Sequence, residues 1–136
     1  MGGEISPRQK RERNMNLQRL EQVVEDLRDD LGNALVATDI WATDDGTSLA
    51  GFNPQPKATA LFNEITRNLI KSLKDSEFPG LGNYYLIQLE NNFSIVIVIQ
   101  DHLQQGMLVD LSHTSFGILT YIVIPKVREG LKDALG

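Results

Sequence analysis

The run from Tyr84 to Gln100, YYLIQLENNFSIVIVIQ, constrains the fold more than any other part of this sequence. It predicts two long strands joined by the two-residue turn Asn91-Asn92, because asparagine tolerates the left-handed backbone of a tight hairpin. The second arm is apolar at every position from Ile95 to Ile99. A strand without polar alternation has both of its faces covered. The chain must therefore place a sheet between two layers, or give one face of the sheet to a partner.

Helical and strand patterns predict the element order α-β-β-α-β-β-β-α, which belongs to the α+β class. Two meanders, of two and three strands, are linked by one helix. Asp44-Asp45-Gly46 is the strongest hairpin turn, and Pro125 should kink or split the last helix. Asp101 to Gly106 is expected to be a turn. Besides the hairpin above, helices are expected over about 14–31, 57–74 and 112–135, and strands over about 34–42, 48–52 and 107–111.

Length and charge limit the class of protein further. With 136 residues, 41% of them hydrophobic and 23% charged, the chain is long enough for one domain with a packed core. The four basic and two acidic residues of 1–14 leave about −7 on the rest of a chain whose formal net charge is −5. This acidic remainder disfavours nucleic acid as a partner. We expect a flexible basic lead over 1–13 and a single domain over 14–136.

The sequence also indicates a compartment. It has no cysteine, which excludes disulfides, thiol catalysis and zinc sites built on cysteine. No run is apolar for long enough to cross a membrane, and the first residues lack the apolar core of a secretory signal. We therefore expect a cytoplasmic protein that does not insert into a membrane.

Motifs that carry catalysis are missing. The patterns GxxxxGK[ST], GxGxxG, HExxH and GxSxG do not occur. His102 and His113 flank the fifth predicted strand, so they are not expected to share a metal ion. Asp39 interrupts a strand and is expected to face solvent from a sheet edge, whereas Trp41 is expected in the core. We therefore predict a protein that is not an enzyme, with no catalytic residue, no metal site and no cofactor.

The ordered elements resemble the Roadblock / dynein light-chain domain family, in its prokaryotic form. The resemblance covers about Leu17 to Leu135 and rests on LGNALVATDIWATDDGTSLAGFN, the helix from Lys57, YYLIQLENNFSIVIVIQ, and MLVDLSHTSFGILTYIVIPKVREGLKDAL. It implies a five-stranded antiparallel sheet with the second helix on one face and the first and last helices on the other. Family members commonly pair through their third strands, with the second helices together. They act as non-catalytic regulators or platforms for small Ras-like GTPases, and others serve motor complexes. Pro125 and the long polar lead depart from the pattern.

The side chains of the strand that begins at Tyr84 also favour a homodimer, independently of the family resemblance. An open edge strand with apolar and aromatic side chains is an aggregation hazard, and pairing two such edges across a two-fold axis removes it. The alternative is that a helix or loop of the same chain covers the edge. The expected homodimer interface consists of Tyr84, Tyr85, Leu86 and Leu89.

The polar side of the second helix is the expected surface for a small Ras-like GTPase. If the protein promotes GTP hydrolysis, we expect it to reshape the partner's active site, with insertion of Arg67 as the alternative. The expected partner-binding residues are Lys57, Asn63, Glu64, Arg67, Asn68 and Lys71.

A small-molecule sensor of the PAS or profilin-like type is the alternative function. It would need a cavity between sheet and helices, which Trp41, Tyr84 and Tyr85 would line. The uninterrupted aliphatic strand from Ile95 to Ile99 favours a filled core instead.

Overall fold

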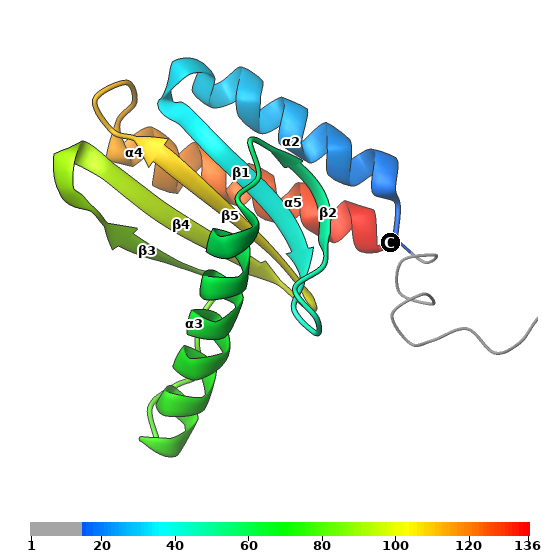
Figure 1. Cartoon of the computed structure of the whole chain (residues 1–136), viewed down its shortest axis with the longest axis vertical. Helices are drawn as coiled ribbons and strands as arrows, with labels where there is room; N and C mark the ends of the chain where they lie inside the picture. Colours follow the sequence, from blue (N-terminus) through cyan, green and yellow to red (C-terminus); the bar gives the residue numbers. More distant parts are fainter. Residues whose placement is uncertain (1–14) are drawn as a thin grey trace, which may run out of the picture.

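A computed structural model describes residues 15–136 as one antiparallel sheet with helices on both faces (Figure 1). The sheet has five strands in the order β2-β1-β5-β4-β3, so β2 and β3 are its two edges. This confirms the α+β class and the order of the elements; the predicted lead over 1–13 lies outside the described residues. The strands are β1 (Leu35–Ala42), β2 (Ser48–Phe52), β3 (Tyr84–Gln88), β4 (Phe93–Gln100) and β5 (Leu103–Asp110), and the longer helices are α2 (Leu17–Leu31), α3 (Pro56–Asp75) and α5 (Ile124–Leu135).

Helices α2 and α5 lie side by side on one face of the sheet and enclose the apolar core (Figure 1). The predicted helix over 14–31 begins at Leu17, because the Asn16 side chain caps it by accepting a hydrogen bond from Arg19 N at 3.0 Å. The two helices approach closely at Gly130, where a Cβ atom would lie 2.6 Å from Val23 Cγ2. The core-facing residues of α2 are Leu20, Val23, Val24, Leu27 and Leu31.

Both expected hairpins form, although the second turn is longer than the predicted two residues: a short helical turn η2 (Glu90–Asn92) joins β3 to β4, closed by the hydrogen bond from Leu89 N to Phe93 O at 2.7 Å. Gly46 has φ +70° in the β1–β2 connection, as the Asp44-Asp45-Gly46 turn requires. Asn91 and Asn92 have φ of 62° and 66° in the β3–β4 connection, so both asparagines adopt the left-handed backbone that the sequence indicated.

Strand β5 begins four residues earlier than the sequence suggested, so the predicted turn over 101–106 is wrong beyond its first two residues. Gln104 and Gln105 look like turn residues but are fully buried in the strand. Their amide nitrogens have partners there: Gln105 Nε2 donates to Thr38 Oγ1 at 3.1 Å, and Gln104 Nε2 donates to Asn63 Oδ1 at 2.7 Å, whereas both Oε1 atoms are buried without a hydrogen bond. Because those partners come from distant parts of the chain, a local pattern does not reveal them.

Pro125 divides the last helical run, as expected. The run consists of a short α4 (Phe116–Ile118), a π-helical turn η3 (Leu119–Val123) and then α5, in which Pro125 is the second residue. The backbone stays helical into α5, and the π-helical turn directly before Pro125 is where the pattern of backbone hydrogen bonds changes.

Candidate functional site on α3 and the β3 edge

Helix α3 lies on the sheet face opposite α2 and α5, and it runs outward beyond the sheet (Figure 1). Its N-terminal half is attached by three buried polar residues, Thr59, Asn63 and Thr66. Their spacing of four and three residues places them on one side of the helix. That side therefore faces the sheet with hydrogen-bonding groups, where most helices present apolar side chains.

Asp39 accepts hydrogen bonds from two hydroxyl groups at the start of this contact. Thr59 Oγ1 donates to Asp39 Oδ2 at 2.7 Å, and Ser48 Oγ donates to Asp39 Oδ1. Asp39 is only 6% exposed, so the prediction that it faces solvent from a sheet edge is wrong. The alternation of strand β1 puts it on the same face as Trp41, and α3 covers that face.

Asn63 is the centre of a second polar contact. Its Oδ1 accepts from Trp41 Nε1 at 3.1 Å and from Gln104 Nε2 at 2.7 Å, and its Nδ2 donates to Thr43 O at 3.1 Å. Trp41 is 1% exposed, which confirms its expected place in the core. The Asn63 side chain is thus committed to the interior of the chain.

Tyr85 makes the third contact, from strand β3. Its hydroxyl lies 2.7 Å from Thr66 Oγ1, and Thr66 Oγ1 also bonds to Phe62 O at 2.8 Å. Burial raises the pKa of Tyr85 above its ordinary value of 10.0, while the hydrogen bond to Thr66 acts in the opposite direction. Tyr85 therefore fastens α3 to the edge strand, in addition to lying in the expected dimer interface.

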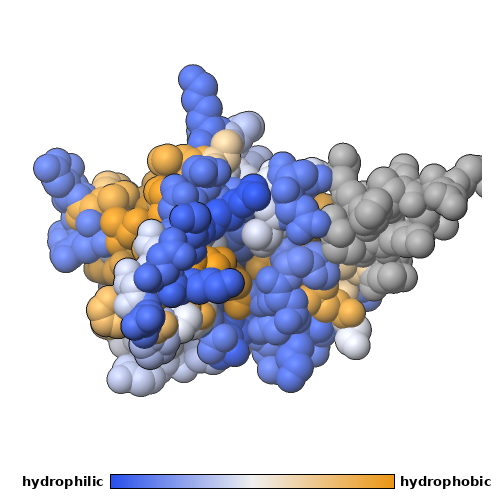
Figure 2. Space-filling view, turned by 90° about the horizontal axis from the view of Figure 1, so that it is seen from below, coloured by the Kyte–Doolittle hydropathy of each residue, from blue (hydrophilic) through white to orange (hydrophobic). Residues whose placement is uncertain are grey.

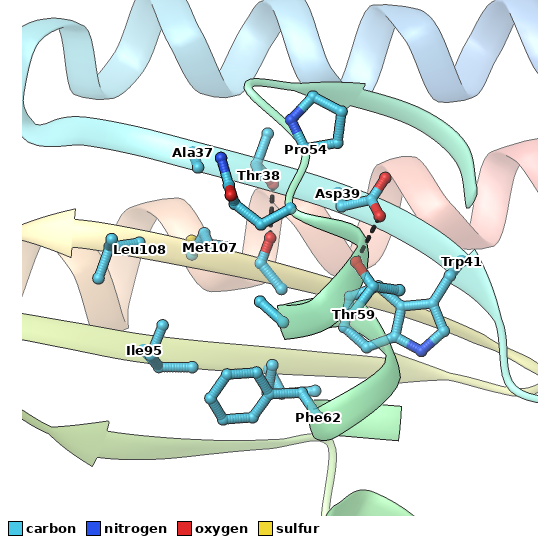
Figure 3. Close-up of a pocket in the computed structure, with 14 residues that line it drawn as sticks. Ala37, Thr38, Asp39, Trp41, Pro54, Thr59, Phe62, Ile95, Met107 and Leu108 are labelled. Atoms are coloured by element: carbon cyan, nitrogen blue, oxygen red, sulfur yellow. Dashed lines mark hydrogen bonds between the residues drawn. The ribbon is translucent and has the colours of Figure 1, made fainter. Parts of the chain in front are cut away.

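An apolar trough of about 100 Å³ opens between α3 and the sheet (Figure 3). Asp39 and Thr59 close one end of it through their hydrogen bond, and Trp41 lies beside them (Figure 3). Aliphatic side chains of β4 and β5 form its floor. The floor therefore includes one of the two apolar faces that the sequence predicted for β4. Its other lining residues include Ala37, Ala58, Phe62, Ile95, Ile97, Met107 and Leu108.

The apolar residues of α3 are not fully covered within this chain. Leu61 is 55% exposed and Ile70 is 45% exposed, and none of the apolar residues of the helix is buried. Figure 2 views the molecule from the side towards which α3 projects, and hydrophobic surface lies open there between hydrophilic side chains. The half-buried members of this apolar set are Ala58, Phe62, Ile65, Leu69 and Leu73.

The expected dimer residues of β3 point in two directions. Leu86 packs against the core under α5, and Tyr84, two residues earlier, points to the same face and is 41% exposed. Tyr85 points to the α3 face, and Leu89 is exposed just beyond the end of the strand. Strand β3 pairs with β4 alone, so its other edge carries unpaired backbone groups in residues 15–136.

The expected partner-binding residues of α3 divide into two groups. Asn63 is buried and faces the sheet, so it does not contribute to an exposed surface. Lys71 forms an ion pair with Asp75 at 3.0 Å. The residues that are exposed along the helix are Lys57, Glu64, Arg67, Asn68 and Lys71.

The sequence offered one unused signal for this arrangement. Thr59, Asn63 and Thr66 share one helical face with the half-buried Phe62, and a polar stripe beside an aromatic residue needs polar partners when it is covered. Asp39 and Trp41, two residues apart on one strand, were the available partners.

No group of three or more histidine, aspartate or glutamate side chains in residues 15–136 is arranged to hold a metal ion. Within the same residues, no helix combines the length and the apolar character needed to span a bilayer.

Comparison with solved structures finds this fold in proteins of low sequence identity. Myxococcus xanthus MglB has a TM-score of 0.74 at 12% identity, over 87% of this chain and 88% of its own. An MglB with a tetrameric arrangement has a TM-score of 0.66 at 13% identity, over 88% of this chain and 92% of its own. A Roadblock/LC7 domain from Streptomyces avermitilis has a TM-score of 0.60 at 8% identity, over 83% and 92%. Neither family models nor curated proteins give a match.

Proposed function

We propose that this chain, whose fold is that of the Roadblock/LC7 domain, is a non-catalytic homodimeric module that binds a small Ras-like GTPase in the cytoplasm. One observation carries the proposal: the apolar side of α3 is left uncovered next to the open edge of β3. A second copy of the chain would cover the apolar side of α3 and would give the open edge of β3 a strand to pair with.

Pairing of β3 with β3 of a second copy removes the unpaired strand edge. The same two-fold axis brings two α3 helices to the same face of a continuous sheet. Leu61, Ile65 and Leu69, which follow one another at steps of four on the apolar side of α3 and are not buried, and the floor of the trough are then available to the other copy's helix. The buried hydrogen bonds of Thr59, Asn63 and Thr66 hold each α3 in position before the copies meet.

Light scattering after size exclusion tests the dimer. The wild-type chain should have twice its mass of 15.2 kDa over a range of concentrations. Leu61→Glu places a charge in the proposed interface and should shift the mass towards one copy. Ala60→Glu is the control and should not, because Ala60 is exposed and lies beside Lys57 and Glu64 on the polar side of the same helix. A wild-type chain that stays at 15.2 kDa at high concentration contradicts the dimer.

The exposed polar residues of α3 are the proposed GTPase-binding surface. Lys57, Arg67 and Lys71 give it positive charge on an otherwise acidic chain, so an acidic partner surface would complement it. Glu64 and Asn68 lie on the same exposed side of the helix.

A double charge reversal tests that surface. Arg67→Glu/Lys71→Glu should abolish capture of the partner GTPase while leaving the mass in solution unchanged. Lys132→Glu/Lys126→Glu on α5, with the same change in charge, serves as the control. Unchanged GTPase capture by the α3 variant would show that the surface is elsewhere.

A second candidate function is that of a small-molecule sensor, which the apolar trough favours. The trough combines an apolar floor with Asp39 and Trp41 at one end, a composition that suits a small ligand with one polar group. Tyr84 does not line it, because its side chain points to the other face of the sheet. Native mass spectrometry would detect a ligand that is retained through purification. Ala58→Trp would fill the trough, so loss of the ligand in that variant would favour this function over the dimer.

A further inference from the structure

The start of the C-terminal helical run exposes a second cluster of large apolar side chains, far in the sequence from α3 and β3. Tyr121 is 84% exposed and Ile122 is 59% exposed, and both lie in the π-helical turn η3. Ile118 of α4 is 44% exposed and lies on the same side of the run, three and four residues before them. We call these three residues, Ile118, Tyr121 and Ile122, the outer stripe.

The opposite side of the same segment is part of the core. Leu119, Val123 and Ile124 are buried beneath the sheet, and Val127 continues that buried side into α5. The segment is therefore apolar on both sides, a pattern that is typical of a helix covered on both sides. Within residues 15–136 the sheet covers only one of them. A cluster of exposed apolar side chains of this kind marks an interaction surface.

The charge distribution indicates what can approach the outer stripe. Residues 116–125, FGILTYIVIP, contain no charged side chain, in a chain whose formal net charge is −5. The next residue, Lys126, donates to Asp30 Oδ2 at 2.9 Å and so is neutralised by α2. Two copies of this acidic chain repel each other over most of their surface, and an uncharged stripe is where that repulsion is weakest.

We propose that the outer stripe is a second self-association surface, at which the stripe packs against the same stripe of another copy across a two-fold axis. A self-complementary contact needs a surface that is compatible with itself, and an apolar stripe without charge meets that condition. An acidic chain is also poorly suited to the anionic surface of a membrane, which disfavours lipid as the occupant. This surface is separate from the α3 and β3 dimer, so both together would join dimers into tetramers.

The size of the stripe sets the expected strength. Three large side chains on each copy bury less than about 1,200 Å² in total, which is the range of weak and transient contacts. Self-association through the stripe should therefore depend on concentration, becoming visible between micromolar levels and about 1 mM.

Sedimentation equilibrium of the full chain over that range tests the proposal, with Tyr121→Lys as the variant. Tyr121 is so exposed that its replacement should not disturb folding, which circular dichroism would verify. The change adds a positive charge to an acidic chain, so it lowers the general repulsion between copies. If association nevertheless weakens, the cause is the change in the stripe and not the change in net charge. Leu17→Lys, at another exposed apolar residue, makes the same change in charge and is the matched control.

We expect the wild type and Leu17→Lys to show a concentration-dependent step that Tyr121→Lys weakens by about tenfold or more. No such step in the wild type, or an equal step in Tyr121→Lys, overturns the proposal. Loss of GTPase capture or vesicle binding in Tyr121→Lys at unchanged mass would also overturn it, because the occupant would be a different molecule. Leu61→Glu should remove only the other step, so failure of the α3 dimer is distinguishable from failure of the stripe.

Cross-linking gives a second readout that does not depend on mass. Because the chain has no cysteine, one introduced cysteine can link only to its own copy in another chain. Ile118→Cys and Ile122→Cys lie at the proposed two-fold contact, and at least one of them should form a disulfide-linked pair on mild oxidation. Leu17→Cys measures random collision. Equal linking at all three positions would contradict a specific contact.

Discussion

Replacement of Asn63 by alanine should loosen α3 from the sheet, although the residue appears from the sequence to belong to the exposed side of the helix. The change removes Oδ1, the acceptor for Trp41 Nε1 and Gln104 Nε2, and Nδ2, the donor to Thr43 O. Gln104 Nε2 retains Thr43 Oγ1 at 3.1 Å, so the Trp41 N–H and the Thr43 carbonyl are the groups left unpaired.

The magnitude follows from those two groups. A buried donor or acceptor without a partner costs about 1–3 kcal/mol. The bond to the Thr43 carbonyl is only part-buried, so that group contributes at the lower end, and Asn63→Ala should lower the free energy of unfolding by about 2–4 kcal/mol in total. For a chain of this size, that corresponds to a fall of about 5–15 °C in the melting temperature.

Urea unfolding followed by tryptophan fluorescence is the appropriate assay, because Trp41 is the single tryptophan and lies in the contact itself. Asn68→Ala, on the exposed side of the same helix, is the matched control and should change stability by less than about 0.5 kcal/mol. Both variants are measured at one protein concentration, since association stabilises the folded state. If Asn63→Ala is as stable as Asn68→Ala, the buried hydrogen bonds of Asn63 do not hold α3 on the sheet.

Three further outcomes are expected. Gly130→Ala should destabilise the chain by about 1–3 kcal/mol in urea unfolding, because its Cβ would lie 2.6 Å from Val23 Cγ2, and Val23→Ala should restore part of the loss. Asp39→Ala should cost about 2–3 kcal/mol by leaving the Thr59 hydroxyl without its acceptor, and Asp39→Asn, which keeps one acceptor oxygen, should cost less. The raised pKa of Tyr85 contributes stability that is complete below pH 10.0 and declines as the pH rises above it, so Tyr85→Phe should melt with a shallower alkaline decline than the wild type. An equal decline in both chains would show that Tyr85 ionisation is not coupled to unfolding.

The sequence by itself determined the fold class, the element order and the hairpins, because these depend on local chemistry. Asn91 and Asn92 accept the left-handed backbone wherever they stand, and Pro125 lacks an N–H in any surroundings. The spacing of apolar residues likewise indicated which side of α2 is buried.

Only the tertiary structure decided which polar residues are inside. Asp39, Asn63 and Gln104 look like surface or turn residues, yet each is buried because a partner arrives from another element: Thr59 for the first, Trp41 for the second and Asn63 for the third. A polar side chain tolerates burial when most of its hydrogen bonds are made, and a pattern read along the chain contains no information on partners 20, 22 or 41 residues away. The same reason applies to the apolar residues. The sequence indicated that α3 and the segment 116–125 are apolar, and the fold decided which of their sides the chain itself covers and which it leaves for another molecule.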